Sequence, residues 1–137
     1  MTEPELVALS KGNVLLIDDD KFLLDMYTMK FTQQGYTAHG CLSVTDGLDT
    51  LHKGFAADAI VFDLIMPERD GFAFLEALRL EKLCPQAVKI ALTNQSSEAD
   101  QNHAKDLGAD VCYVKASMIP SEVVNMVGGE IAGRKAK

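Results

Sequence analysis

The chain has 137 residues, 47% of them hydrophobic, which suits one globular domain with a buried core. Its formal net charge is −7, from 20 acidic and 13 basic side chains, and such a surface repels the phosphodiester backbone of DNA or RNA. No apolar run approaches the roughly eighteen residues of a membrane span, and the first residues lack the basic region of a signal peptide. We therefore expect a cytoplasmic protein that contacts neither nucleic acid nor membrane.

In the first half of the chain, three short apolar runs alternate with two segments of helical spacing. Asp20 can cap the first helix and Gly35 can end it. Leu23, Tyr27 and Phe31 recur between them at the spacing of a buried helical stripe. In chain order the sequence predicts a strand at 14–17, this helix, a weak strand at 37–41, a helix at about 44–52 and an apolar strand at 59–62.

The second half opens with a turn-rich loop at 63–71, in which Asp70 and Gly71 are expected to form a turn. Ser96 or Ser97 can cap a later helix, and Pro120 suits the first turn of the last one. In chain order the sequence predicts a helix that Pro85 terminates, a strand at 88–92, a helix from Ser96 or Ser97 to 107, a strand at 111–114 and a helix from Pro120 that stops before Gly128 and Gly129.

Five strands and five helices in strict alternation are typical of a doubly wound α/β sheet, for which a common strand order is 2-1-3-4-5. The three cysteines, an odd number with no C-x-x-C spacing, argue against a disulfide framework and a zinc site. We expect one domain over residues 13–127, an N-terminal extension at 1–12 and a C-terminal tail at 128–137.

Polar side chains follow four of the predicted strands, at the point where each strand ends. In an open parallel sheet, ligands bind in the crevice outside the carboxyl ends of the strands, so these side chains are expected to share one pocket. They are Asp18 and Asp19 after the first strand, Asp63 after the third, Thr93 after the fourth and Lys115 after the fifth.

Three clustered carboxylates must protonate or bind a cation, because two like charges 4 Å apart repel by roughly 4 kcal/mol at an effective dielectric constant of 20. Oxygen-only ligands favour Mg²⁺. Once a cation is placed, Asp63 can act as a nucleophile toward a phosphoryl group, as carboxylates do in forming aspartyl phosphates. Lys115 supplies a movable positive charge and Thr93 a hydroxyl donor for the phosphoryl oxygens.

With these residues the chain resembles a response-regulator receiver domain of two-component signalling, of the stand-alone kind that chemotaxis regulators represent. The resemblance covers residues 13 to 127 and implies a flavodoxin-like doubly wound five-stranded parallel sheet in the order 2-1-3-4-5, with five helices on both faces. It rests on Asp18-Asp19, Thr93, Gly108-Ala109-Asp110, Lys115 and the motif Asp-Leu-Ile-Met-Pro-Glu-Arg-Asp-Gly at 63–71.

By this resemblance Asp63 is the phosphoacceptor, and a histidine kinase or histidine phosphotransfer protein is the donor. Thr93 and Lys115 would contact the phosphoryl oxygens. Such a protein is a regulator that assists its own phosphorylation and dephosphorylation rather than an enzyme, and its output is contact with another protein. The implied Mg²⁺ ligands are Asp19 directly, Asp18 largely through water, Asp63 and the backbone carbonyl of Ile65.

The sequence departs from the usual receiver pattern at three positions. Ala116 stands where Pro usually follows the Lys, and Asn94 replaces the small residue that usually follows the Thr. The aromatic expected three positions before Lys115 is Cys112, and Tyr113 comes one position later. Because strand side chains alternate faces, Tyr113 is expected on the opposite side of the sheet from the usual switch aromatic.

The first helix carries a second apolar stripe, formed by Phe22, Met26 and Met29. One interpretation is a wide buried face packed on the sheet. The other is a docking surface for a helical partner, since Met and aromatic patches suit adaptable interfaces, and in receivers the kinase or phosphotransfer helices approach this side.

Other functions on the same topology fit the residues less well. In a flavodoxin-type electron carrier, three aspartates after the first strand would repel the flavin phosphate. In a small phosphatase with an aspartyl nucleophile, a carboxylate is expected where Ile65 stands. The alternative that stays open is a degenerate receiver-like interaction module that is not phosphorylated, which Cys112 and Ala116 suggest.

Overall fold

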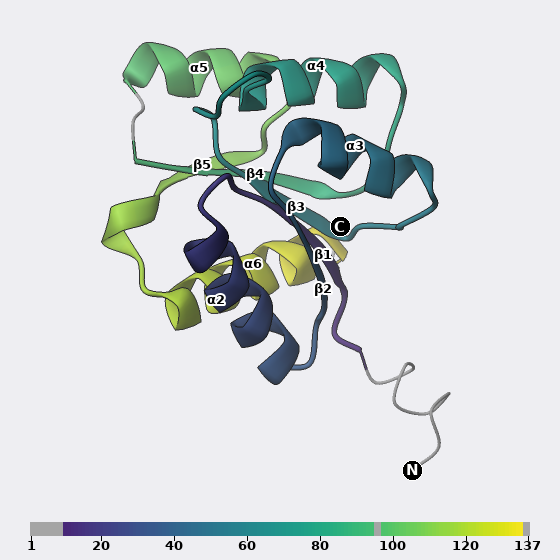
Figure 1. The fold of residues 1–137 in the computed structure, drawn as a ribbon, viewed down its shortest axis with the longest axis vertical. Coiled ribbons are helices and arrows are strands. Elements are labelled where there is room, and N and C mark those ends of the chain that lie inside the picture. The colour runs from purple at the N-terminus through teal and green to yellow at the C-terminus, as the bar shows by residue number, and fades with distance from the viewer. Residues whose placement is uncertain (1–9, 95–96, 136–137) are drawn as a thin grey trace.

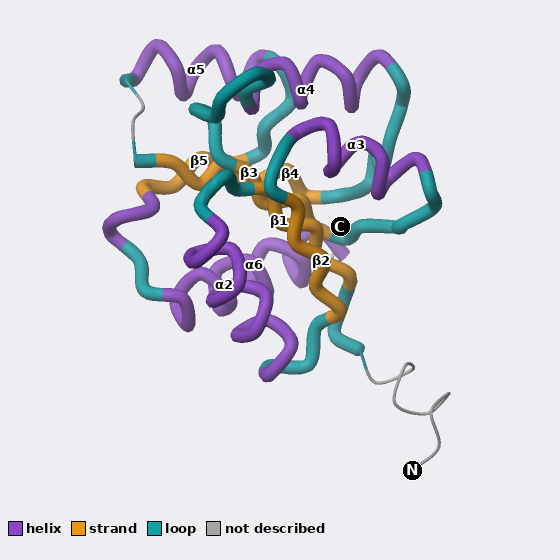
Figure 2. Tube along the Cα trace, viewed as in Figure 1, coloured by secondary structure: helices purple, strands orange, loops and turns teal. Residues whose placement is uncertain are grey.

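The computed structural model describes residues 10–94 and 97–135 and shows a five-stranded parallel sheet with helices on both faces (Figures 1 and 2). The strand order is β2-β1-β3-β4-β5, so the predicted topology is confirmed. The strands are β1 (Asn13–Ile17), β2 (Thr37–Cys41), β3 (Ala59–Phe62), β4 (Val88–Thr93) and β5 (Val111–Val114).

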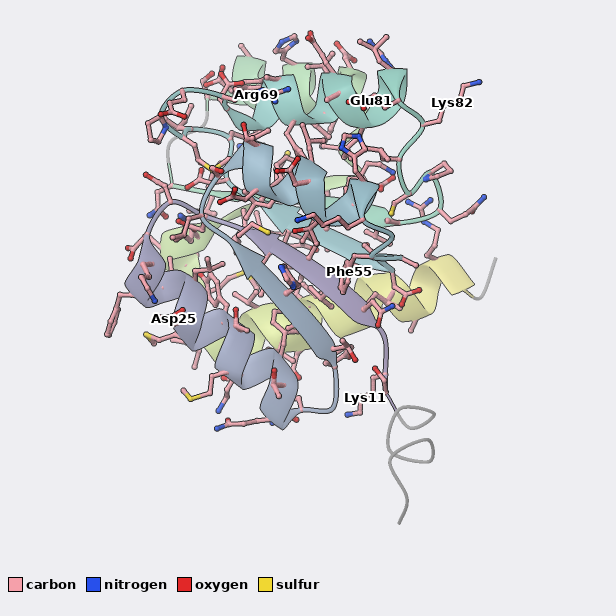
Figure 3. The ribbon with its side chains drawn as sticks, turned by 45° about the vertical axis from the view of Figure 1, so that its right-hand side comes forward. Lys11, Asp25, Phe55, Arg69, Glu81 and Lys82 are labelled. Atoms are coloured by element: carbon pink, nitrogen blue, oxygen red, sulfur yellow. The ribbon has the colours of Figure 1, made fainter. Side chains whose placement is uncertain are left out.

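Two helices cover one face of the sheet and three cover the other (Figure 1). The first pair is α2 (Lys21–Gln33) and α6 (Pro120–Lys135), and the three on the opposite face are α3 (Val44–His52), α4 (Gly71–Leu80) and α5 (Glu98–Asp106). A short 3₁₀ helix, η1 (Lys115–Ser117), joins β5 to the loop before α6. The turned view in Figure 3 shows the sheet between these two helical layers.

The side chains of β1 explain why the sheet has two cores. Leu15 and Ile17 pack into the cluster under α3, α4 and α5, whereas Val14 and Leu16 pack into the cluster under α2 and α6. Successive strand residues point to opposite faces, so a strand covered on both faces needs the continuous apolar run that the sequence shows. All four residues of β3 are buried for the same reason.

Helices α2, α3, α4 and α5 begin where a polar N-cap side chain accepts a hydrogen bond from a backbone N–H of the first turn. Asp20 accepts from the N–H of Leu23, as predicted, and Ser97 forms a capping box with Asp100. The alternative cap, Ser96, lies outside the described residues, as do residues 1–9 of the predicted extension. Asp70, predicted as a turn residue, is the N-cap of α4 and accepts from the N–H of Ala73.

Gly71 also differs from the prediction, because it is the first residue of α4 rather than part of a separate turn. A Cβ there would lie 2.5 Å from the carbonyl oxygen of Asp63 and 2.8 Å from the Cα of Leu64. The absence of a side chain therefore lets α4 start against the strand end that carries Asp63.

Two details of the predicted helices α4 and α2 were wrong. Helix α4 ends at Leu80, before Pro85, since Lys82 takes a left-handed φ of 54°. On α2 the buried stripe contains Leu24 with Tyr27 and Phe31, and Leu23 is only half-buried.

The largest error concerns α6, which does not stop at Gly128 and Gly129 but continues to Lys135. Two interior glycines destabilise a helix by only about 1 kcal/mol each. Ile131 is buried against the sheet, and Arg134 pairs with Asp110 at 2.7 Å, so packing beyond the glycines outweighs their low helix propensity.

This continuation of α6 can be tested with Gly129→Ala. A Cβ at Gly129 meets no atom within 4 Å, so alanine should raise the free energy of unfolding by about 0.5 to 1 kcal/mol through its helix propensity. Gly128→Ala is the matched control, because its Cβ would clash with the hydroxyl of Tyr36. This variant should gain less free energy of unfolding than Gly129→Ala, or lose some. Chemical denaturation measures both, and no gain at 129 would show that the helix stops earlier.

Candidate functional site

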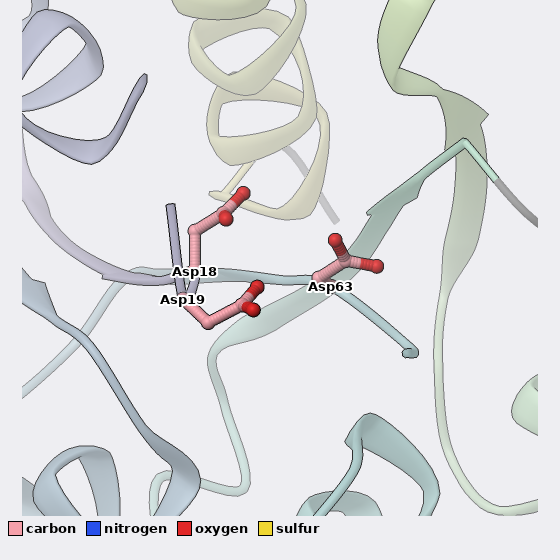
Figure 4. A group of neighbouring side chains, drawn as sticks. All are labelled: Asp18, Asp19 and Asp63. Carbon is pink, nitrogen blue, oxygen red and sulfur yellow. The ribbon is translucent and has the colours of Figure 1, made fainter. Parts of the chain in front are cut away.

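The carboxyl ends of β1 and β3 bring three carboxylates together (Figure 4). Carboxylate oxygens of Asp18, Asp19 and Asp63, which we call the acidic cluster, all lie within 4.8 Å of one another. Asp18 and Asp63 are buried, with 5% and 8% of their surface exposed, while Asp19 is exposed. One ion could contact all three side chains, and the buried pair cannot rely on water to offset its charge.

Lys115, at the end of β5, supplies the compensating charge. Its Nζ donates to Oδ2 of Asp18 at 2.8 Å and to Oδ2 of Asp63 at 2.7 Å. Burial alone would lower the pKa of Lys115, but the hydrogen bonds and negative charges of Asp18 and Asp63 outweigh it, so the pKa lies above its ordinary value. The ammonium therefore stays charged throughout the neutral range.

The other oxygen of each buried carboxylate is held by the backbone. Oδ1 of Asp18 accepts from the N–H of Asp20 at 2.9 Å, and Oδ1 of Asp63 accepts from the N–H of Ile65 at 3.2 Å. In both Asp18 and Asp63, a backbone N–H thus holds Oδ1 and the Lys115 ammonium holds Oδ2.

Thr93 and Ile65 complete the neighbourhood of Asp63. Thr93 is buried as the last residue of β4, whereas the Ile65 side chain is exposed. Together with Asp63 and Asn94 they line an open pocket of about 240 Å³. The structure thus gathers all the predicted site residues, and the pocket gives a small group direct access to Asp63.

The sequence of residues 14–127 matches the family model of the response regulator receiver domain. The chain belongs to this family. Over 112 residues it is 30% identical to the response regulator SaeR of Staphylococcus aureus, and this match covers 82% of the chain. The chain spans about half, 47%, of the length of that curated relative.

Solved structures show the same fold at lower sequence identity. A CheY-like response regulator receiver domain protein from Methanospirillum hungatei JF-1 superposes with a TM-score of 0.81 at 22% identity, covering 91% of this chain and 97% of that one. The chemotaxis protein CheY4 of Vibrio cholerae gives a TM-score of 0.77 at 24% identity, covering 84% of this chain and 94% of that one.

Membership places the chain in phosphorylation-based two-component signalling. Receiver domains act as phosphoacceptor switches that interact with histidine kinases or phosphotransfer proteins, and they typically bind Mg²⁺ at a cluster of aspartates. The acidic cluster of this receiver offers the hard oxygen donors that Mg²⁺ prefers. Within residues 10–94 and 97–135, each helix falls short of the length and apolarity that crossing a membrane requires.

The displaced aromatic of this receiver lies where strand alternation predicts. Cys112 packs against the core under α3, α4 and α5, and Tyr113 packs against the core under α2 and α6. The Tyr113 hydroxyl donates to Oε1 of Glu130 on α6 at 3.3 Å. Burial raises the pKa values of both the Cys112 thiol and the Tyr113 hydroxyl. On the face that usually holds the switch aromatic, β5 therefore presents a neutral thiol.

The second stripe of α2 is mostly exposed, so the interpretation as a wide buried face was wrong. Phe22 has 77% of its surface exposed and Met29 has 56%, while Met26 is half-buried. Large apolar side chains at this exposure leave a patch available for contact.

Two contacts were not foreseen from the sequence. Lys115 was predicted for phosphoryl contact, yet it also neutralises Asp18 and Asp63 directly. The requirement that buried carboxylates find a cation, applied to the neighbouring strand end, could have indicated this. The second contact is a hydrogen bond in which the backbone N–H of Ala116 donates to Oδ1 of Asn94, and no local sequence signal predicts it.

The bridging role of Lys115 leads to a stability prediction. In buffer without divalent cations, Lys115→Met should lower the free energy of unfolding by about 3 kcal/mol, because it leaves buried carboxylates without their counter-charge. Lys21→Met is the matched control. Its partner Asp25 is an i,i+4 neighbour on the outside of α2 (Figure 3), and the two side chains are 70% and 65% exposed, so the loss should stay below about 0.5 kcal/mol. Equal small losses in the two variants would show that Lys115 does not offset the carboxylate charge.

Proposed function

We propose that this receiver is a phosphorylation-dependent signalling switch that accepts a phosphoryl group on Asp63 in the presence of Mg²⁺ and signals by protein contact. The observation that carries the proposal is the position of Asp63. Its carboxylate borders an open pocket, lies within the acidic cluster and is hydrogen-bonded to Lys115. A nucleophile, positive charge and room for a small anion thus occur together.

The residues around the pocket fit a magnesium ion. The donors would be the carboxylates of Asp18, Asp19 and Asp63 with the backbone carbonyl of Ile65, and Asp18 would act largely through water. All are hard oxygen ligands, and the three carboxylates are close enough to share one ion. When bound, the ion would neutralise the carboxylates and the phosphoryl oxygens, which would otherwise repel each other.

In the transfer step, a carboxylate oxygen of Asp63 attacks phosphorus as the bond from phosphorus to the donor histidine nitrogen breaks. The histidine keeps the bonding electrons. Lys115, already at 2.7 Å from Asp63, would contact the phosphoryl oxygens, and the Thr93 hydroxyl would donate to another. The added charge would draw Thr93 and Lys115 inward and raise the population of an active conformer.

The donor is proposed to be a histidine kinase or histidine phosphotransfer protein that docks on the exposed stripe of α2. Helix α2 starts at Lys21, two residues after Asp19, so its first turn lies close to the acidic cluster. A partner seated on Phe22, Met26 and Met29 would therefore be close to Asp63.

Phosphorylation can be tested with a small acyl phosphate as the donor. The protein should gain the mass of one phosphoryl group in the presence of Mg²⁺ and lose this reactivity when the ion is chelated. Asp63→Asn should abolish labelling because the amide is not a nucleophile. Asp70→Asn is the matched control. Asp70 caps α4 outside the acidic cluster, so this variant should be labelled as fast as the wild-type protein. Intact-mass spectrometry measures the outcome.

Two results would contradict this proposal. Unlabelled wild-type protein at saturating Mg²⁺ would favour the alternative, an interaction module that is not phosphorylated. Equal labelling of wild type and Asp63→Asn would place the acceptor at another residue.

The docking stripe leads to a different prediction. The triple variant with Phe22, Met26 and Met29 changed to Ser should accept a phosphoryl group from a phosphohistidine protein at least tenfold more slowly, because apolar contact area is lost. Labelling by the small acyl phosphate should stay normal, which separates docking from chemistry. Leu80→Ser is the control, as Leu80 is 77% exposed on α4 across the sheet. Normal transfer from the protein donor to the triple variant would exclude this surface.

A further inference from the structure

Asn94 connects the two loops that carry the phosphoryl-contacting residues. It directly follows Thr93, the last residue of β4, and its Oδ1 accepts a hydrogen bond from the backbone N–H of Ala116. Ala116 directly follows Lys115. One side chain–backbone contact therefore joins the residue after Thr93 to the residue after Lys115.

This contact depends on two of the three residues at which the chain departs from the receiver pattern. A proline at position 116 would have no N–H to donate. A small side chain at position 94 would have no carbonyl oxygen to accept. Each departure thus supplies the hydrogen-bonding group that the other requires.

The contact also bears on where the Lys115 ammonium can go. The Nζ of Lys115 reaches both Asp18 and Asp63, and η1 begins at Lys115 itself. Holding the Ala116 N–H fixes the backbone immediately after Lys115, so movement of the ammonium is left to its flexible side chain. Asn94 also lines the pocket beside Asp63, so the hydrogen bond to Ala116 fixes the position of its side chain in that pocket.

We infer that Asn94 is a positioning residue that holds the Lys115 loop for phosphoryl transfer through its hydrogen bond to the Ala116 N–H. The inference rests on the proposed phosphorylation of Asp63. Asn94 acts through the backbone of the next loop, and its loss should displace Lys115 from its optimal place without removing the charge.

The test compares Asn94→Leu, Asn94→Ala and Asn94→Asp. Leucine has about the bulk of asparagine but cannot accept the hydrogen bond from Ala116. Alanine cannot accept it either and also enlarges the pocket. Aspartate keeps an oxygen that can accept it. The first readout is amide hydrogen exchange of Ala116, measured without Mg²⁺ or phosphoryl donor. Leucine and alanine should each accelerate exchange at least fivefold, and aspartate should retain the protection. The amide of Val88, which bonds to the carbonyl of Asp58 at 3.0 Å far along the sheet, should be unchanged and controls for global stability.

The second readout is the rate of labelling by a small acyl phosphate. Asn94→Leu and Asn94→Ala should both be labelled three- to tenfold more slowly, as expected when one hydrogen bond is lost. Unchanged Ala116 exchange in Asn94→Leu, or faster labelling in Asn94→Ala, would overturn the inference, and the second result would assign Asn94 to pocket access by size. An unlabelled wild-type protein refutes the proposed function instead, and the exchange measurement then still decides whether Asn94 holds the loop.

Discussion

The site depends on one electrostatic constraint, which is that two buried carboxylates at neighbouring strand ends need a positive charge between them. Asp18 and Asp63 come from β1 and β3, which pair directly in the sheet, and neither has enough exposure for water to offset its charge. The Lys115 ammonium meets both at hydrogen-bonding distance. The parallel order β2-β1-β3-β4-β5 makes this possible because it puts all these strand ends at one edge.

The same constraint suggests how the site can respond to a ligand. In the proposed switch, an ammonium, a divalent cation and a phosphoryl group would all compete for the oxygens of Asp63 and its neighbours. Lys115 has a long flexible side chain and can exchange one partner for another, whereas Asp18 and Asp63 are each held by a backbone N–H. In the proposed switch, a change of charge at Asp63 would therefore act first on Lys115, which is hydrogen-bonded to it, and on the loop that follows Lys115.

Local sequence rules predicted most of the architecture. The strands at 59–62 and 111–114 and the helix at 44–52 have the predicted bounds, because apolar runs and turn residues mark them clearly. Helix α6 was predicted too short because glycine propensity was weighted above the packing of Ile131, which only the folded sheet reveals. Whether the second stripe of α2 is buried or exposed could not be predicted from periodicity. A broad apolar stripe has the same sequence pattern whether or not another part of the protein covers it.

The candidate site was also predictable only in part. The sequence predicts which residues share one edge of the sheet, because each follows the carboxyl end of a parallel strand: Asp18, Asp19, Asp63, Thr93 and Lys115. The double contact of Lys115 and the bond between Asn94 and Ala116 depend on side-chain directions across loops that are far apart in sequence. No periodic pattern encodes such contacts, so they required the three-dimensional structure.

The most direct measurement of the central claim is a structure determined with Mg²⁺ and a beryllofluoride analogue of the phosphoryl group. The account predicts that the analogue is bound to Asp63, that the ion contacts the acidic cluster, and that the Lys115 Nζ has left Asp18 to contact the analogue. A structure in which Lys115 still joins Asp18 to Asp63, with no analogue bound at saturating concentration, would contradict it.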